Sequence, residues 1–253
     1  MYLRAVEPLS KARRKQLRAL TTRKGREEAG LFIAEGPRLV EEALRAGAVP
    51  RYVVVCDALV SAAQRARVDG LLMRPSAFSA TEDELADGAD TVHSQGMLAV
   101  FPIPAPDLGV LDRPRLTLVV LDNVRDPGNL GTIARHAAAF GADALLLTEG
   151  CVDPWNGKAV RASMGGLFHV PVLPADALPE DVALYAASRG GADVYSTSFP
   201  QRVALIVGSE AGGVGPDLMA RATPLGIPQT DRVESLNAAT AASIVLSWRY
   251  QSA

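Results

Sequence analysis

The chain has 253 residues, of which 48% are hydrophobic and 21% are charged. This composition is typical of a globular protein and excludes a disordered or fibrous chain. Two cysteines, Cys56 and Cys151, are far apart and form no CxxC motif, so we expect neither a disulfide scaffold nor a thiolate zinc site. The charged start is unlike a signal peptide, and there is no apolar run of about 18 residues. We therefore expect a cytoplasmic protein that does not enter a membrane.

The net charge of −2 conceals an uneven distribution. Residues 1–26 contain nine Lys or Arg residues and one acid, Glu7, whereas the rest of the chain carries a net charge of −10. A basic arm ahead of an acidic body favours binding to nucleic acid. The alternative is an amphipathic surface helix with Ser10 as its N-cap and with Leu17 and Leu20 facing inward. The charge pattern leaves both interpretations open.

The first third of the chain alternates strand and helix patterns. Apolar runs at 31–34 and 52–56 predict short buried strands. Between them, Pro37 favours the start of a helix that Gly47 ends. The inward face of that helix is formed by Leu39, Val40, Ala43 and Leu44. This pattern indicates a small α/β domain.

A second α/β domain is predicted after a proline-rich linker. Residues 101–114 contain four prolines and no sustained periodicity, so we expect an extended segment there. The predicted domains are therefore 1–104 and 105–253. In the second domain, four short apolar runs predict parallel strands, at 116–121, 144–148, 184–187 and 204–207.

Two helices complete this prediction. Apolar residues at helical spacing in 130–140 predict a helix that ends at Gly141. The last helix, from about Ser235 to Trp248, is apolar almost all round, so we expect it to be buried. Its polar residues form one narrow stripe of Asn237, Thr240, Ser243 and Ser247.

Two loops follow predicted strands, and a third begins at an apolar strand end that breaks at Pro228. Open α/β sheets bind their ligands in loops at the carboxyl ends of strands. The three loops span 122–135, 207–214 and 227–237. Asn129 and Ser235 are candidate N-caps for the helices that follow their loops. The middle loop is rich in glycine, which allows the backbone to approach a ligand closely, and it contains one carboxylate, Glu210.

Other catalytic schemes find little support. His93, His136 and His169 are scattered without metal-ligand spacing, so we expect no metal site. The absence of a GxSxG motif argues against a serine hydrolase of the α/β type. On the residue patterns by themselves, the sequence indicates an α/β ligand-binding domain with a basic arm.

In this order, the three loops resemble the signature motifs of the SpoU (TrmH-type) branch of the SPOUT RNA methyltransferases. The matching sequences are NVRDPGNLGTIAR, LIVGSEAGGV and IPQTDRVESLNAATA, within about residues 116–248. FIAEGPRLVEEAL and HSQGMLAV are similar to the L30e-like substrate-binding domain of the same family. The resemblance implies an α/β fold with a parallel sheet and a deep trefoil knot, preceded by a smaller L30e-like α/β domain that binds RNA.

The resemblance also implies an activity: methyl transfer from S-adenosyl-L-methionine to a ribose 2′-hydroxyl in RNA, without a metal. Because a substrate-binding domain precedes the catalytic one, rRNA, and 23S rRNA in particular, is favoured over tRNA. The catalytic positions implied are Asn129, Arg135, Glu210, Ser235 and Asn237. The cofactor contacts implied are Gly208, Ile227 and Leu236. A homodimer through the knotted domain is expected.

The role of Arg135 is open between general base and electrostatic anchor. An arginine guanidinium keeps its proton up to a pH of about 12, so we favour contact with a phosphate and stabilisation of the forming alkoxide. The third motif departs from the family pattern at Gln229, Ala238 and Ala239, where Met, Val and Ser are common. We expect the change at Gln229 to alter the cofactor pocket, and the changes at Ala238 and Ala239 to remove side-chain volume from a packed helix.

The stretch WNGKAVRASMGGLFHVP resembles a family helix that closes over the site, with Lys158 and Arg161 available to phosphates; a plain surface helix is the alternative. Three other functions remain in view: a non-catalytic RNA- or ribosome-binding protein with the same knot, an rRNA methyltransferase that confers antibiotic resistance, and a methyltransferase acting on a base nitrogen. The intact motif residues favour an enzyme, and the motif-1 arginine together with the SLN of the third motif favours ribose.

Overall fold

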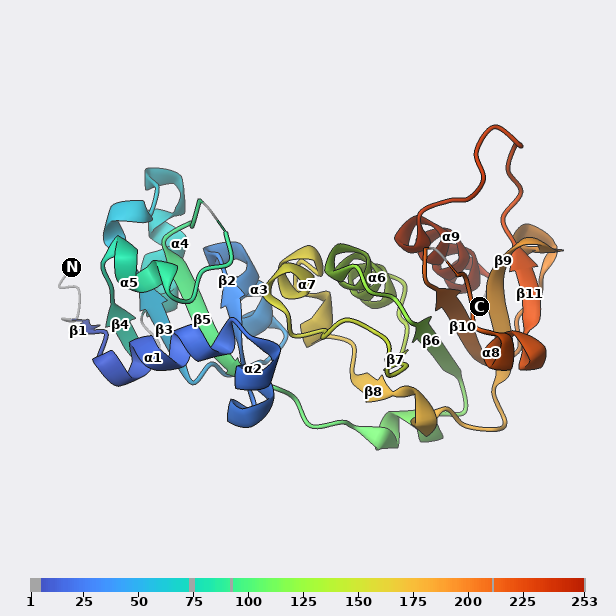
Figure 1. Cartoon of the computed structure of the whole chain (residues 1–253), viewed down its shortest axis with the longest axis horizontal. Helices are drawn as coiled ribbons and strands as arrows, with labels where there is room; N and C mark the ends of the chain where they lie inside the picture. The colour runs from blue at the N-terminus through green and yellow to red at the C-terminus, as the bar shows by residue number, and fades with distance from the viewer. Residues whose placement is uncertain (1–5, 73–75, 92, 211, 253) are drawn as a thin grey trace. The chain divides into compact units, whose positions relative to one another are not determined.

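The structure is a computed structural model that describes residues 6–72, 76–91, 93–210 and 212–252. Arg4, one of the nine cations counted in residues 1–26, lies outside the described residues. The chain divides into two compact units (Figure 1). Unit 1 is Met1–Pro104 with Trp155–Phe168, and unit 2 is Ala105–Pro154 with His169–Ala253. We call Trp155–Phe168 the inserted segment, because it interrupts unit 2 in sequence while it packs in unit 1.

Unit 1 is built on a five-stranded mixed sheet with the order β1-β4-β3-β5-β2. The strands are β1 (Glu7–Pro8), β2 (Leu31–Glu35), β3 (Tyr52–Val55), β4 (Ala77–Ser79) and β5 (Met97–Pro102). β5 runs antiparallel to β2 and β3, whereas β4 is parallel to both β1 and β3. The strands predicted at 31–34 and 52–56 are therefore confirmed.

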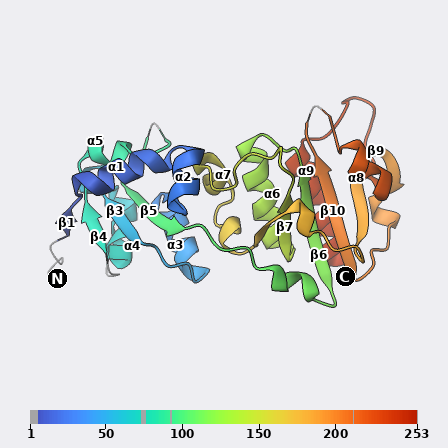
Figure 2. The same cartoon turned by 60° about the horizontal axis from the view of Figure 1, so that its bottom comes forward.

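Helices cover both faces of this sheet (Figure 2). They are α1 (Lys11–Leu20), α2 (Arg23–Ala29), α3 (Pro37–Arg45), α4 (Ala62–Leu72) and α5 (Glu82–Ala86), with a short 3-10 turn at Asp57–Leu59. Side chains alternate along the strands, so that Leu31, Tyr52 and Leu98 join the core beneath α1 and α5. The predicted helix that starts at Pro37 is confirmed, and Leu39, Val40 and Ala43 are buried on its inner face while Leu44 is half-buried.

The basic stretch of residues 1–26 is folded wherever it is described. Ser10 is the N-cap of α1 and accepts a hydrogen bond from the Arg13 N–H at 3.3 Å. Leu17 and Leu20 are buried in the core of unit 1. The amphipathic helix expected for these residues is therefore confirmed, and the binding of nucleic acid by their charges stays a prediction.

The inserted segment packs against β2 through α7 (Gly157–Ala162) and a 3-10 turn at Gly166–Phe168. Its two large aromatic residues join a cluster around Phe32. The ring centroids of Trp155 and Phe168 lie 4.7 and 5.7 Å from that of Phe32, and Phe168 also meets Phe101 at 5.2 Å. This aromatic cluster explains why the segment belongs to unit 1, since burial of each ring removes a large apolar area from water.

Unit 2 contains a six-stranded sheet with the order β11-β9-β10-β6-β7-β8. Its strands are β6 (Leu116–Asp122), β7 (Ala144–Leu147), β8 (Val172–Pro174), β9 (Ala183–Asp193), β10 (Arg202–Gly208) and β11 (Thr223–Gly226). Every pairing in it is parallel. The four predicted parallel strands are confirmed. β8 was not predicted as a strand, and only the end of β11 was recognised, ahead of Pro228, because each strand is short and contains a proline.

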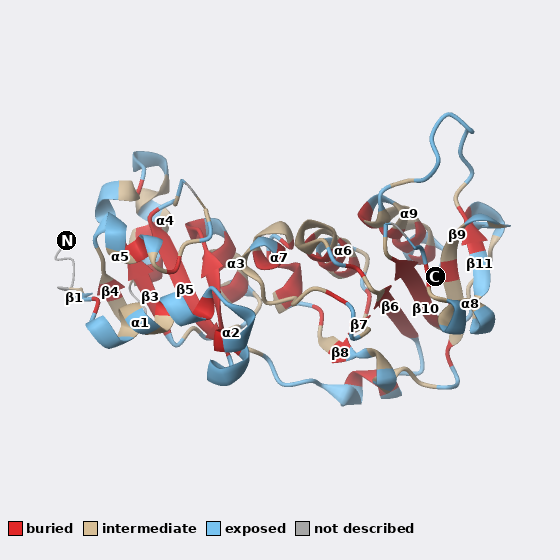
Figure 3. Ribbon diagram, in the orientation of Figure 1, coloured by how far each residue is buried: buried red, intermediate tan, exposed pale blue. Residues whose placement is uncertain are grey.

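The helices of unit 2 are α6 (Pro127–Ala139), α8 (Pro216–Arg221) and α9 (Ala238–Gln251), with 3-10 turns at Leu108–Asp112, Ala175–Ala177 and Val194–Ser196. α6 and α9 pack against each other. The strands are the most deeply buried elements (Figure 3). No helix formed by the described residues is long and apolar enough to cross a membrane.

The last helix differs from its prediction in two respects. It begins at Ala238 rather than Ser235, because the side chain of Asn237 caps it. Along α9, the residues buried within the chain are Ala239, Ala242, Val245, Leu246 and Arg249. The expected burial all round is therefore wrong, because most of the other α9 residues are only half-buried in this chain.

Candidate functional site

The loops of the first two motifs leave unit 2 from neighbouring strands. β6 and β10 are parallel, and their last residues, Asp122 and Gly208, are paired in register. The carboxyl ends of adjacent parallel strands lie at the same edge of a sheet, where α/β proteins bind ligands. The sheet therefore brings the segments after Asp122 and Gly208 together, although they are far apart in the sequence.

Helix capping at this edge differs from what the sequence predicts. Asp126 is the N-cap of α6, because its carboxylate accepts a hydrogen bond from the Asn129 N–H at 2.8 Å. Pro127 occupies the first turn, where its missing N–H costs nothing. The N-cap roles expected for Asn129 and Ser235 are both wrong. The amide side chain of Asn129 is thereby available for other contacts.

Asn129, Glu210 and Asn237 form a continuous chain of hydrogen bonds. The Asn129 Nδ2 donates to Glu210 Oε1. The Asn237 Nδ2 donates to Asn129 Oδ1 at 2.9 Å. The Asn237 Oδ1 accepts from the N–H groups of Ala239 and Thr240 at the start of α9. The chain thus joins one residue from each of the three sequence motifs, and we call it the amide relay.

Chemistry fixes the direction of the amide relay. A carboxylate only accepts hydrogen bonds, so Asn129 must present its NH₂ group to Glu210 and its oxygen to Asn237. At the other end, the free N–H groups of a helix N-terminus require an acceptor, which orients Asn237 in the same sense. Each amide therefore has one satisfactory orientation, and the three side chains hold one another in position.

The glycine-rich loop after β10 is held by backbone contacts and by Asp122. Ser209 and Gly213 exchange backbone hydrogen bonds at 2.9 and 3.0 Å. The Gly215 N–H donates to the Asp122 carboxylate at 2.6 Å, and the Thr148 hydroxyl lies 3.3 Å from the same group. Asp122 is a positioning residue to which the sequence analysis gave no role. Its place as the last polar residue of a buried strand was the available signal.

Gly208 is required by this turn. A Cβ atom at position 208 would lie 2.0 Å from the carbonyl carbon of Gly213 and 2.3 Å from the Val214 nitrogen. Real Cβ contacts are never this short, so any side chain would displace the loop that presents Glu210. The structure thus gives Gly208 a reason for its identity that is separate from the predicted cofactor contact.

A pocket of about 460 Å³ lies between the β9 and β11 strands and the loop of the third motif. Its lining residues are Ala187, Ser188, Arg189, Leu225, Ile227, Gln229, Ser235, Leu236 and Ala241. Small-molecule sites are mainly apolar, with a few polar groups. Apolar walls from Ile227 and Leu236 with a few polar side chains at hand match the chemistry of S-adenosylmethionine, an adenosine attached to an amino acid. The residues present fit this group.

Arg189, which lines this pocket, holds the loop of the third motif in place through two hydrogen bonds. Its guanidinium donates to the carbonyl oxygen of Glu234 at 3.0 Å and to the Asp231 carboxylate at 2.7 Å. Both acceptors lie in the loop between β11 and α9. Arg189 could not be identified from the sequence, because a single arginine in a glycine-rich segment carries no recognisable signal.

Arg135 lies on the exposed surface of α6, six residues after Asn129. Within the described ranges no ion pair or hydrogen bond occupies its guanidinium. The neighbouring His136 is half-buried, and its ring lies near the backbone of Ala239 on α9. Burial, followed by the positive charge of Arg135, lowers the pKa of His136 below its ordinary value of 6.5, although the backbone of Ala239 opposes this shift.

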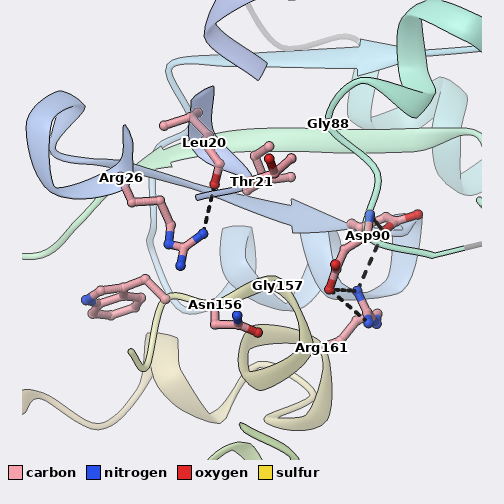
Figure 4. Close-up of a pocket in the computed structure, with 11 residues that line it drawn as sticks. Leu20, Thr21, Arg26, Gly88, Asp90, Asn156, Gly157 and Arg161 are labelled. Atoms are coloured by element: carbon pink, nitrogen blue, oxygen red, sulfur yellow. Dashed lines mark hydrogen bonds and ion pairs between the residues drawn. The ribbon is translucent and has the colours of Figure 1, made fainter. Parts of the chain in front are cut away.

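A second pocket lies wholly within unit 1, between α2, β2 and the inserted segment (Figure 4). Arg161 points into it and contacts the carboxylates of Asp90 and Glu35 at 3.3 and 3.7 Å. Arg26 donates to the carbonyl oxygen of Leu20 on the opposite wall. The expectation that Arg161 is available to phosphates is wrong, because two carboxylates already neutralise it.

Comparisons with known proteins agree with this geometry. The model of the SpoU rRNA Methylase family matches residues 116–247, and that of the MRM3-like substrate binding domain matches residues 11–99. The chain is 32% identical to the 23S rRNA (guanosine(2553)-2'-O)-methyltransferase RlmP of Bacillus subtilis, over 96% of this chain and 98% of that protein. It is 36% identical to human mitochondrial rRNA methyltransferase 3 over 66% of this chain, which spans 42% of the human protein.

Solved structures show the same fold over nearly the whole chain. An AdoMet-bound rRNA methyltransferase from Sinorhizobium meliloti is 30% identical, has a TM-score of 0.81, and is matched over 97% of both chains. The SpoU methyltransferase AviRb from Streptomyces viridochromogenes, in complex with AdoMet, is 26% identical with a TM-score of 0.82, over 96% of this chain and 98% of that one.

Proposed function

Because the chain belongs to the SpoU rRNA methylase family, we propose that it methylates a ribose 2′-hydroxyl of 23S rRNA. The family assignment makes the chain an rRNA methyltransferase that uses S-adenosylmethionine. Ribose as the acceptor and 23S rRNA as the molecule are the finer parts of the proposal. They draw on the 2′-O-methyltransferase from Bacillus subtilis, which matches the chain almost end to end.

The amide relay is the observation that carries the proposal. It links Asn129, Glu210 and Asn237 across more than 100 positions of sequence, at the edge of the sheet where a ligand binds. Preorganised polar groups of this kind contribute to catalysis because they need no rearrangement when charge develops. We infer that the amide relay fixes the walls between which cofactor and ribose meet.

The remaining residues supply binding and charge. When bound, the cofactor supplies a methyl carbon attached to a positively charged sulfur. Ile227 and Leu236 offer it apolar contact, and Ser235 stands at the same pocket. The exposed guanidinium of Arg135 is proposed to bind a phosphate next to the target ribose and to stabilise the oxygen as its proton passes to that phosphate or to water. Alignment of the reacting atoms is worth several kcal/mol by itself.

The C-terminal segment is proposed to form the trefoil knot and the dimer contact of the family. α9 packs on α6 while much of its surface is only half-buried in this chain. Phe140 of α6 and the exposed Tyr250 of α9 pair at 6.3 Å at the ends of these helices. A second copy would cover this apolar surface. Light scattering on the purified protein is expected to give twice the mass of one chain, and a monomer would contradict the proposed dimer.

A cytoplasmic location is proposed, because rRNA is the proposed substrate.

The test uses the purified protein, labelled S-adenosylmethionine and separate transcripts of 23S rRNA, 16S rRNA and tRNA. We expect label in 23S rRNA, and digestion to nucleosides should recover it as a 2′-O-methyl ribonucleoside. A methylated base would refute the ribose assignment. Label in tRNA but not in rRNA would refute the assignment of rRNA as the substrate.

A second experiment separates the enzyme from a non-catalytic RNA-binding protein. Calorimetry should detect binding of S-adenosylmethionine, and Arg135→Lys should lower turnover sharply because lysine lacks the planar, two-pronged donor geometry of arginine. Nearly full turnover of that variant would exclude a bidentate role for Arg135.

A further inference from the structure

Unit 1 has an open hollow beside α1. Its lining residues are Ser10, Ala12, Arg13, Gln16, Ala29, Leu31, Arg51 and Tyr52. They come from α1, from the end of α2, and from the starts of β2 and β3. No acidic residue is among the residues that line the hollow.

The polar groups of this hollow are hydrogen-bond donors. Gln16 uses its oxygen to accept from the Tyr52 hydroxyl at 2.9 Å, which leaves its NH₂ group for a ligand. Ser10 uses its oxygen as the N-cap of α1, so its O–H remains to donate. Arginine side chains have donors only. A hollow that offers donors and positive charge is complementary to an anion.

The two arginines of the hollow, Arg13 of α1 and Arg51 just before β3, differ from Arg14 and Arg18. Arg14 and Arg18 both form ion pairs with Asp87. Arg13 instead lies over Phe78, with its guanidinium carbon 3.9 Å from the ring centroid, and this contact holds the side chain in place. Arg51 is exposed, and in the part of the chain that the structure describes no carboxylate pairs with either arginine.

We propose that this hollow binds phosphate groups in the backbone of the RNA substrate, with Arg13 and Arg51 as the charged contacts. The inference rests on the proposed function, since it names a contact site for the same substrate. RNA is favoured over a free anion because the hollow is open and its two arginines come from separate elements. The family model that covers this part of the chain describes a substrate-binding domain.

The test measures RNA affinity without cofactor, by fluorescence anisotropy on a labelled fragment mixture of 23S rRNA over a range of salt concentrations. Arg51→Gln should weaken binding about threefold to tenfold, and the slope of log affinity against log salt should fall by about one. The double variant with Arg13→Gln should lose more and flatten the slope by about two. Arg51→Lys keeps the charge and should restore most of the affinity.

The matched control is Arg45→Gln, which removes the same charge from an arginine already paired with Glu41 and Glu42. Equal affinities for Arg51→Gln and Arg45→Gln would overturn the proposal. So would stabilisation by inorganic phosphate that depends on Arg51 while RNA affinity does not, because the hollow would then serve a free anion. Thermal unfolding of each variant checks that the variant is still folded, because Arg13 packs against Phe78 of the core.

Failure of this inference is distinct from failure of the proposed function. If the wild-type protein methylates 23S rRNA and Arg51→Gln binds it normally, only the hollow is wrongly assigned. If the wild-type protein binds RNA through Arg51 but methylates no ribose, the hollow stands and the activity is wrong.

Discussion

At the scale of single residues, the site depends on amide groups with only one workable orientation. Asn129 is held between a carboxylate and a second amide, and Asn237 serves both the amide relay and the N-terminus of α9. Loss of one donor therefore leaves its partners without their hydrogen bonds, which costs more than the bond itself is worth.

Asn129→Asp tests the amide relay with almost no change in shape. The new carboxylate cannot donate to Glu210, and it places a second negative charge beside it. We expect turnover to fall by about 100-fold through misplacement of the reacting groups, with cofactor affinity changed far less. Asn156→Ala, which removes the N-cap of α7 in unit 1, is the control and should leave turnover intact. Equal turnover of Asn129→Asp and the wild-type protein would contradict the role of the amide relay.

Gly208→Ala tests the turn beneath Glu210. The added methyl group meets the backbone of Gly213 and Val214, so the loop must move. A loss of about 1–3 kcal/mol in unfolding free energy is expected from such overpacking, together with loss of activity. Gly212→Ala is the matched control, because a Cβ there meets only the Ser209 hydroxyl at 3.3 Å. Denaturant titration of both variants compares them, and equal stability would show that the loop yields without cost.

Single residues were also where sequence patterns were least reliable. The motifs predict which loops supply the candidate site. Three of the five candidate catalytic side chains are joined by hydrogen bonds. Spacing did not show that Asp126 caps α6, because an Asp-Pro-Gly-Asn turn contains two acceptable N-caps. Arg189 acts through contacts distant in sequence, and such contacts leave no local pattern.

At the scale of elements, the packing of α6 on α9 links the site to a titratable group. His136 lies on α6 and reaches the backbone at the start of α9. Its Nδ1 is buried with no partner among the described residues. A proton on this ring would be poorly solvated, which is why burial disfavours the charged form.

Stability is therefore expected to depend on pH through His136. Its pKa is lowered in the folded state, so the unfolded chain binds a proton more readily. The unfolding free energy should be highest above a pH of about 6.5 and should fall as the pH drops below it. Replacement by His136→Gln should flatten this dependence, whereas His169→Gln, at an exposed histidine, should not. Denaturant unfolding between pH 5 and pH 8 measures it, and an unaltered profile in His136→Gln would rule out this histidine as the cause.

The loop between β11 and α9 depends on Arg189. Arg189→Gln removes the charged donor that reaches Asp231 and Glu234. Because both partners are largely exposed, the ion pair is worth at most about 1 kcal/mol. We expect S-adenosylmethionine affinity to fall about twofold to fivefold, as measured by calorimetry. Arg221→Gln, on the exposed end of α8, should leave the affinity for S-adenosylmethionine unchanged. If Arg189→Gln and Arg221→Gln bind S-adenosylmethionine equally well, the contacts of Arg189 do not contribute to cofactor binding.

Strand prediction succeeded where an apolar run contained no proline and failed where a short run contained one. The runs at 116–121 and 204–207 contain no proline, and both strands are central in the sheet. β8 and β11 are short and contain Pro174 and Pro224, so the apolar pattern is broken in both. The parallel direction followed from the buried runs, but the strand order could not, because it depends on which crossovers pack.

At the scale of the whole molecule, two units share one interleaved chain. The sequence predicts a boundary near the proline-rich linker, and the chain leaves unit 1 at Pro104. It returns at Trp155 and leaves again at Phe168. The return could not be predicted from the linker composition, because the signal is a pair of aromatic residues whose partners, Phe32 and Phe101, lie in another part of the sequence.

Hydrogen exchange tests to which unit the inserted segment belongs. Leu17→Ala removes a fully buried side chain from the core of unit 1 and should cost about 2–5 kcal/mol. Exchange in α7 should then accelerate together with β2, while β6 of unit 2 keeps its protection. Leu118→Ala in the core of unit 2 is the mirror control. If α7 instead followed β6, its assignment to unit 1 would fail.

The interleaving has a consequence for protein engineering. Exchanging residues 1–104 for the corresponding domain of another protein by cutting near Pro104 would leave Trp155 and Phe168 in the retained part of the chain, without the aromatic rings that they pack against. A working chimera would have to transplant residues 155–168 along with the donor half, or redesign them as a polar connection. The natural unit of exchange is therefore two pieces of sequence, not one.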